Sequence, residues 1–218
     1  MRLQLKPQSL PRLAASVALA FSLSAAASPA AIVYFPSEDI PIPANFAGVS
    51  VDLETGATST DLAGLPDGDA NFFFGGAEIS NDADETASAP SWQPVRTGTG
   101  NTDPIAALTL GTTVDGTSTY AAGFGSSGDV STHFGPLTAG QQEYIGFSLT
   151  PNGGGGPLYG WMLVTLQTDA SDLEGTIHSW AYEDQAGVPI LVGAIPEPGS
   201  AALGLFGLAA LALRRRRR

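Results

Sequence analysis

The chain has 218 residues, a formal net charge of −12 and no cysteine. The lack of cysteine excludes disulfide bonds, thiolate metal ligands and a thiol nucleophile. The excess of acidic residues argues against electrostatic binding to nucleic acid or to anionic lipid.

The N-terminal residues have the pattern of a secretory signal peptide. Three basic residues, at positions 2, 6 and 12, precede the apolar run Leu13–Ala27, and small residues follow it. A basic region, an apolar region and a small-residue cleavage site in this order define such a peptide. We therefore place a signal peptide at residues 1–27, with a cut after Ala27 as first choice and a cut after Ala30 as second. An uncleaved anchor is the alternative, although the apolar run is short for one.

Residues 28–195 form the body of the protein and are strongly acidic. Arg96 is their only basic residue, and they contain 20 of the 21 acidic residues, so their net charge is about −19. Solubility is the simplest consequence of this charge, and Ca²⁺ binding or repulsion of acidic polymers are the alternatives. The segment is long enough for one domain with a hydrophobic core.

The body has the pattern of many short strands separated by turns. It is dense in Gly, Ser, Thr, Asn, Asp and Pro, and no stretch shows a sustained helical stripe of apolar residues. The expected strands are Ile32–Phe35, Phe46–Leu53, Asn71–Ile79, Trp92–Arg96, Ile105–Leu110, Tyr144–Leu149, Leu158–Gln167, Gly175–Tyr182 and Ile190–Gly193. Turn signals such as Asp67-Gly68 and Ala186-Gly187 separate them. The predicted fold class is all-β, a β-sandwich or jelly-roll-like exported domain.

Two of these strands carry further information about the sheet. Leu158–Gln167 alternates only weakly between apolar and polar residues, which predicts a central strand buried on both faces. In Gly175–Tyr182, strict alternation places His178, Trp180 and Tyr182 on one face and Ile177 with Ser179 and Ala181 on the other.

The best candidate for a metal site is the stretch from Asp67 to Glu78. Asp67, Asp69, Asn71 and Glu78 match positions one, three, five and twelve of a calcium loop, but Phe72 stands where the loop needs glycine. An Asp-Gly turn that leads into a strand is the simpler interpretation. A non-helical Ca²⁺ site that uses Asp67 and Asp69 is the sharper one.

No catalytic constellation is evident in the body. Its two histidines, His133 and His178, are too few for a typical zinc site, and no G-x-S-x-G motif is present there. Pairs of carboxylates could serve a glycosidase, but 20 acids will always include close pairs. We expect no enzymatic activity and no cofactor, with Ca²⁺ as the one possible exception.

The C-terminal segment has the pattern of a localisation signal. Pro196 and Pro198 flank Glu197 and favour extended backbone. Residues 199–213 are apolar apart from Ser200 and would span about 22 Å as a helix, which is short for a bilayer core of about 30 Å. A terminal cluster of arginines follows: Arg214, Arg215, Arg216, Arg217 and Arg218. Such a cluster stays on the cytoplasmic side of the inner membrane, so a single transmembrane helix would place the triplet on the outer side.

This arrangement of triplet, apolar run and arginines resembles the PEP-CTERM sorting signal of Gram-negative bacteria. The resemblance implies that a membrane transpeptidase, an exosortase, recognises residues 196–218 and cuts near Pro196, Glu197 and Pro198. An ordinary tail anchor is the alternative.

The last quarter of the body resembles many PEP-CTERM ectodomains. Tyr159-Gly160-Trp161 is followed by a turn, by Trp180-Ala181-Tyr182-Glu183 and by Pro189-Ile190. The resemblance implies a sandwich-like exported domain and no particular activity. The four aromatic residues Tyr159, Trp161, Trp180 and Tyr182 are best interpreted as packing residues, with carbohydrate stacking as the alternative.

These observations predict an exported protein of the cell envelope or extracellular matrix. It would be anchored transiently in the inner membrane and sorted by an exosortase, and its body would have a structural role rather than an enzymatic one. A carbohydrate- or Ca²⁺-binding module is the alternative function, and an enzyme acting on polysaccharide is a third. Exopolysaccharide is the expected partner outside the cell; nucleic acid is not.

Overall fold

The computed structural model of the chain describes residues 30–36, 39–81, 91–100, 103–121, 137–152, 154–167 and 172–196.

The largest layer is a mostly antiparallel sheet built around two long neighbouring strands, β10 and β11. Its order is β1-β11-β10-β9-β7, and β2 also pairs with β11. The strands are β1 (Ile32–Phe35), β2 (Ile40–Ile42), β7 (Trp92–Pro94), β9 (Gln142–Leu149), β10 (Leu158–Thr165) and β11 (Gly175–Glu183). Strand β10 lies between β9 and β11 and is buried along nearly its whole length. The prediction of a central strand covered on both faces is therefore confirmed.

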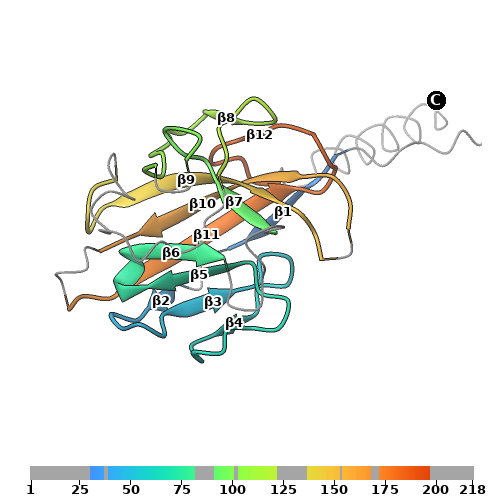
Figure 1. Cartoon of the computed structure of the whole chain (residues 1–218). Coiled ribbons are helices and arrows are strands. Elements are labelled where there is room, and N and C mark those ends of the chain that lie inside the picture. The colour runs from blue at the N-terminus through green and yellow to red at the C-terminus, as the bar shows by residue number, and fades with distance from the viewer. Residues whose placement is uncertain are drawn as a thin grey trace, which may run out of the picture.

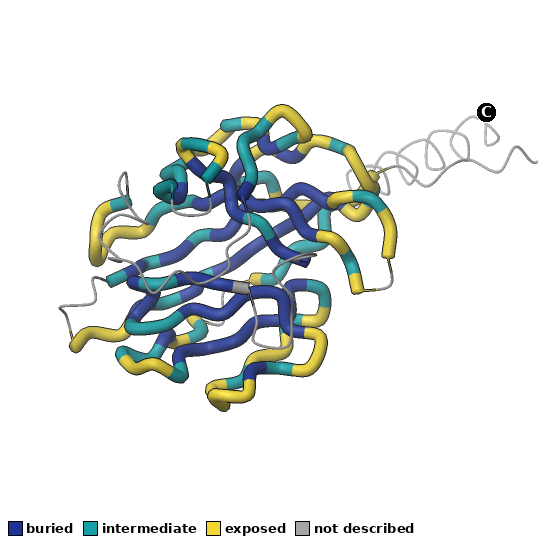
Figure 2. The backbone as a smooth tube through the Cα atoms, in the orientation of Figure 1, coloured by how far each residue is buried: buried dark blue, intermediate teal, exposed yellow. Residues whose placement is uncertain are grey.

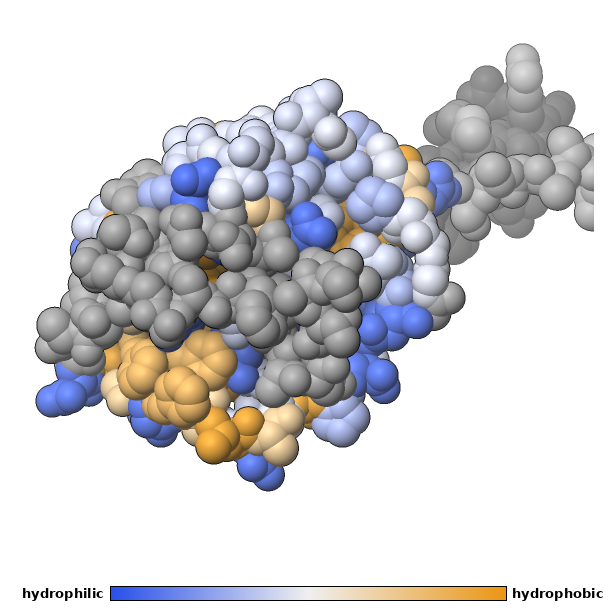
Figure 3. Space-filling model, in the orientation of Figure 1, coloured by the Kyte–Doolittle hydropathy of each residue, from blue (hydrophilic) through white to orange (hydrophobic). Residues whose placement is uncertain are grey.

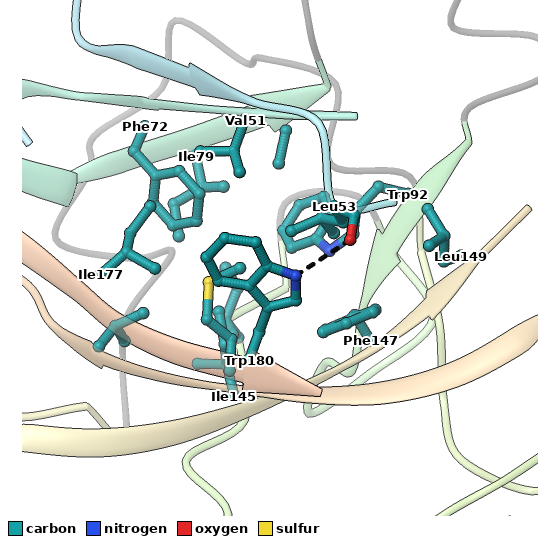
Figure 4. Close-up of a cluster of buried hydrophobic side chains, with 14 of the residues drawn as sticks. Val51, Leu53, Phe72, Ile79, Trp92, Ile145, Phe147, Leu149, Ile177 and Trp180 are labelled. Carbon is teal, nitrogen blue, oxygen red and sulfur yellow. Dashed lines mark hydrogen bonds between the residues drawn. The ribbon is translucent and has the colours of Figure 1, made fainter. Parts of the chain in front are cut away.

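A second sheet of four antiparallel strands lies below the first in Figure 1. Its order is β4-β3-β5-β6, with β3 (Val49–Val51), β4 (Thr58–Ser59), β5 (Ala70–Phe73) and β6 (Glu78–Asn81). Between the two sheets lies the main hydrophobic core, which includes Phe72, Trp92, Phe147, Met162 and Trp180 (Figure 4). The indole of Trp180 donates a hydrogen bond of 3.1 Å to the carbonyl of Leu53 and so joins the layers.

A short pair of strands covers the opposite face of the large sheet. It consists of β8 (Thr113–Val114) and β12 (Ile190–Leu191), above the large sheet in Figure 1. A second core cluster lies beneath it and includes Val114, Tyr159, Trp161 and Ile190. Figure 2 shows buried backbone through the middle of the layers and exposed loops at their ends. The body is thus all-β and sandwich-like, with a small third layer.

The side chains of β10 divide between the two cores according to strand alternation. Met162 and Val164 belong to the main core, whereas Tyr159 and Trp161 belong to the second. Successive side chains of a strand point to opposite faces, so the single strand β10 supports both cores.

An irregularity in β11 changes the expected alternation. Leu163 pairs with Ser179 but Val164 pairs with Ile177, so His178 is an extra residue, a β-bulge. Ile177 therefore shares the main core with Trp180 and Tyr182. The prediction that Ile177 faces away from these aromatic residues was wrong, because the bulge shifts the alternation by one residue.

Two other predicted strands differ in the structure. Asn71–Ile79 is a hairpin rather than one strand, because Phe74, Gly75 and Gly76 all have left-handed backbone, with φ of 49°, 70° and 89°. This conformation costs glycine little, so the glycine pair turns the chain. Ile105–Leu110 forms only isolated bridges, in which Ile105 pairs with Arg96 and Leu108 with Tyr144, so no continuous ladder forms.

The predicted signal helix and most of the predicted C-terminal segment lie outside the described residues. Within the described part of the chain, the structure contains no helix with the length and apolar character needed to cross a membrane.

Replacing Phe147 by alanine should reveal the importance of the main core. The side chain is fully buried, so Phe147→Ala is expected to lower the free energy of unfolding by about 3–5 kcal/mol. Denaturation of the purified full-length chain, followed by tryptophan fluorescence, measures this change. Leu62→Ala is the control, because Leu62 is 59% exposed and its loss should cost less than about 0.5 kcal/mol. Equal effects of the two variants would contradict the described core.

Candidate functional site

The C-terminal segment leaves the folded body next to Trp161. The indole nitrogen of Trp161 donates a hydrogen bond of 3.1 Å to the carbonyl oxygen of Ala194. Trp161 itself is only 2% exposed, in the second core, against which Ala194 also packs. The next residue, Ile195, is 52% exposed, and Pro196 is exposed as well. The chain therefore leaves the core immediately before the Pro-Glu-Pro triplet.

The rest of the predicted sorting signal is not described. Pro196 is the last described residue, and Glu197, Pro198 and the arginines from Arg214 to Arg218 lie beyond it. Ala194 is thus the anchoring point of this segment. It holds the start of the signal at the surface, where Ile195 and Pro196 are exposed.

Asp69 of the candidate calcium loop braces the body. It is fully buried. One carboxylate oxygen accepts a hydrogen bond of 2.7 Å from the backbone amide of Leu53, and the other accepts one of 2.6 Å from the hydroxyl of Ser91. Asp69 thereby joins two loops that are distant in sequence.

The other members of that loop are spread along a hairpin. Asp67 has a left-handed backbone, with φ of 63°, and its carbonyl accepts a hydrogen bond from the Asn152 side chain. Glu78 pairs with Phe73 at the turn end of the β5–β6 hairpin. Phe73 is the fourth residue after Asp69, a distance of about 13 Å at the ordinary rise per residue of a strand. Burial raises the pKa of Glu78.

These positions do not form the predicted twelve-residue loop. Within the described residues, no three His, Asp or Glu side chains converge in a way that could hold a metal ion. Calcium binding by Asp67 and Asp69 stays a prediction.

The aromatic residues of the C-terminal strands belong to the cores. Tyr159, Trp161, Trp180 and Tyr182 are between 2% and 7% exposed. Phe35 stacks on Trp180 with ring centroids 4.7 Å apart, and Tyr120 stacks on Tyr159 at 6.0 Å. The structure therefore uses these four side chains for packing and presents none of their ring faces openly to solvent.

A different aromatic group is exposed, and sequence reasoning missed it. The phenylalanine patch consists of Phe46, Phe73 and Phe74; the ring of Phe46 lies 5.7 Å from that of Phe73 and 5.9 Å from that of Phe74. Phe46 is 61% exposed, and the other two are half-buried. Figure 3 shows an apolar patch on this side of the molecule, near the turn of the β5–β6 hairpin. Exposed apolar clusters commonly mark interaction surfaces.

A polar network surrounds the bulged residue His178. Its Nδ1 lies 2.7 Å from an Asp39 carboxylate oxygen, and its Nε2 lies 2.8 Å from the hydroxyl of Thr165 and 3.3 Å from the Gln142 amide. Asp39 has a left-handed backbone, with φ of 45°, at the interruption between β1 and β2. The side chain of Asp39 is 67% exposed. A charged contact with that much exposure to water contributes only about 0–1 kcal/mol to the stability of the fold. The network thus links β9, β10 and β11 to Asp39, which lies just before β2, at the position of the bulge. His133 lies outside the described residues.

Arg96 is buried among carbonyl groups. It is 3% exposed and donates a hydrogen bond of 2.6 Å to the carbonyl of Asp103 and one of 3.5 Å to that of Ala121. Burial lowers the pKa of Arg96, and the nearby charge of Asp103 opposes this shift. The one basic side chain of the body is thus an internal clamp for loops.

Fold and site together define an acidic, sandwich-like β domain that extends an exposed proline-containing segment from its C-terminal edge. The family model described as the PEP-CTERM protein-sorting motif matches residues 194–218. The chain therefore carries a PEP-CTERM sorting motif, which implies export and exosortase-mediated sorting to the cell envelope or beyond. The match begins at Ala194, the residue that Trp161 holds.

The other comparisons say nothing about the body. No curated protein and no solved structure matches the chain.

Replacing Asp69 by asparagine should weaken the body. The amide has one uncharged oxygen, which can accept from only one of the Leu53 N–H and the Ser91 hydroxyl, so a loss of about 2–3 kcal/mol in the free energy of unfolding is expected. Chemical denaturation of the full-length chain measures it. Asp61→Asn, at an exposed loop position, is the control and should be nearly neutral. A neutral Asp69→Asn variant would refute the bracing role.

Proposed function

We propose that this protein is a non-enzymatic component of the cell envelope or extracellular matrix, delivered there by an N-terminal signal peptide and a C-terminal sorting signal. The N-terminal signal peptide starts export. The apolar run before Arg214 holds the chain transiently in the inner membrane, and an exosortase then cuts near Glu197.

The observation that carries this proposal is the match of the sorting motif to residues 194–218. The geometry of the junction supports it, because the body ends in a fixed residue, Ala194, and continues into exposed chain. The polar side chains of the interior also support a structural role. The charged groups of Asp69 and Arg96 form hydrogen bonds with backbone and hydroxyl groups, and these bonds hold loops in place.

Intact mass spectrometry of the protein recovered from producing cells tests this function. The mature chain is expected to end near Glu197 in the parent strain and to retain Arg214 to Arg218 in a strain without the exosortase. Any additional mass at the new end would identify an attached group. Retention of the arginines in both strains would mean that the segment is a plain anchor. Robust hydrolase or lyase activity of the purified protein would refute the non-enzymatic role.

The phenylalanine patch favours a second candidate function, the binding of a neutral polysaccharide. The rings of Phe46, Phe73 and Phe74 offer adjacent apolar faces against which the C–H face of a sugar ring can pack. The patch consists of uncharged side chains, whereas the body has a net charge of about −19 and repels acidic polymers. A neutral polymer therefore fits this surface better than an acidic one.

Replacing Phe46 by alanine tests the patch. Phe46→Ala is expected to weaken retention on neutral polysaccharides from the producing cells at least threefold, because it removes the most exposed ring. Affinity electrophoresis of the full-length chain measures the retention, and unfolding curves show whether the body is intact. Leu62→Ala provides an exposed apolar control on another loop. Equal retention of wild type and Phe46→Ala would exclude the patch as the binding surface.

A further inference from the structure

The first described residues of the body are held by an acidic pair at the end of β11. The backbone nitrogen of Ala31 donates a hydrogen bond of 2.8 Å to a carboxylate oxygen of Asp184. The backbone nitrogen of Asp184 donates one of 3.0 Å to the carbonyl of Ala31. Ile32, the next residue, is the strand partner of Glu183. Two hydrogen bonds with Asp184 therefore hold Ala31, and the pairing of Ile32 with Glu183 holds the next residue.

Glu183 is an unusual neighbour for this position. It is only 6% exposed, and its Oε1 has no hydrogen-bond partner among the described residues. Burial first, and then the charge of Asp184, raise the pKa of Glu183. A buried carboxyl group with an unused acceptor, beside a second carboxylate, is costly unless a cation or several donors complete it. An amide nitrogen at Ala31 supplies one donor and no charge.

We propose that export processing cuts the chain after Ala30, and that Asp184 and Glu183 bind the α-ammonium group released at Ala31. This inference rests on the export that the sorting motif implies and selects the second of the two cleavage sites that the sequence allows. In the cut, water adds across the Ala30–Ala31 peptide bond, catalysed by the signal peptidase of the export machinery. Ala30 leaves with a carboxylate, and Ala31 keeps the nitrogen as an ammonium group.

The ammonium group would meet both needs of the acidic pair. It carries one positive charge and three donors where the amide carries one donor, so it can keep the bond to Asp184 and offer charge and two further donors next to the residue that pairs with Glu183. A cut after Ala27 would leave an ordinary amide at Ala31 and would place the new amine three residues away. The contacts therefore distinguish the two sites.

The amine and the acids should shift each other's pKa values in opposite directions. A nearby carboxylate favours the protonated amine, so the pKa of the Ala31 amine is expected to lie about one unit or more above the ordinary range of about 7.7–8.0. Reciprocally, the ammonium group favours the ionised carboxylates. This mutual stabilisation exists only while the amine is protonated and the carboxyl groups are ionised, so it disappears as the pH rises through the pKa of the bound amine.

The sequence makes the amine easy to observe. Lys6 is the only lysine in the chain, and it precedes both candidate cleavage sites. After either cut, the N-terminal amine is the only amine of the protein, and an amine-reactive acylating reagent reports on it alone.

The test uses the mature protein recovered from producing cells. Intact mass and N-terminal sequencing should show Ala31 as the first residue. The rate of acylation as a function of pH should give a raised amine pKa in the wild type and a value in the ordinary range in Asp184→Asn. At neutral pH the wild type should therefore react about tenfold more slowly. Asp184→Asn keeps an oxygen acceptor for Ala31 and removes only the charge, and Asp61→Asn is the matched control.

Glu183→Gln is the second variant, in case Asp184→Asn is not recovered, and it should also lower the amine pKa. A first residue of Ser28 would overturn the proposal. So would an ordinary amine pKa in the wild type, or one that neither acidic variant changes. The C-terminal end is read from the same mass, so a failure of exosortase processing is visible separately from a failure at Ala31.

Discussion

The structure depends on one strand, β10, that is covered on both faces. Its alternate side chains enter two different cores. Met162 and Val164 lie in the main core, and Tyr159 and Trp161 lie in the second core. Such a strand must be flanked by partners on both edges, because its amide and carbonyl groups have no access to water. Strand β9 supplies them along its full length, and β11 supplies them from Gly160 to Thr165. The small sheet and the β8–β12 pair then complete the two faces.

The second core also connects the two ends of the body. Tyr34 of β1 lies against Trp161, with ring centroids 6.1 Å apart, and the indole of Trp161 holds the carbonyl of Ala194. Four residues before Tyr34 is Ala30, and two residues after Ala194 is Pro196. Both proposed processing sites thus lie a few residues outside the second core around Trp161, one before β1 and one after Ala194. Export can remove or cut what lies beyond them without disturbing the core.

Several carboxylates of this acidic body accept hydrogen bonds from backbone amides nearby in the sequence and so stabilise turns. Asp52 accepts hydrogen bonds from the amides of Glu54 and Thr55 in its own turn, and Asp115 does the same for Thr117. The hydrogen bonds from Thr117 lower the pKa of Asp115. Arg96, the only basic residue of the body, binds carbonyls rather than carboxylates. The described part of the domain therefore relies on amide and hydroxyl donors more than on ion pairs.

The sequence by itself determined the address, the all-β class, most strand positions and the central place of β10, since these follow from composition and from the alternation of side chains along one strand. Only the tertiary structure decided which segments meet. The bulge at His178 reversed the faces of part of β11, the glycine turn folded a predicted strand into a hairpin, and packing exposed Phe46 while it buried Asp69. The contact between Ala31 and Asp184 joins residues 153 positions apart. Local patterns report the face of a strand, but they carry no information on its partner, because pairing is selected by the burial and hydrogen bonding of the whole domain.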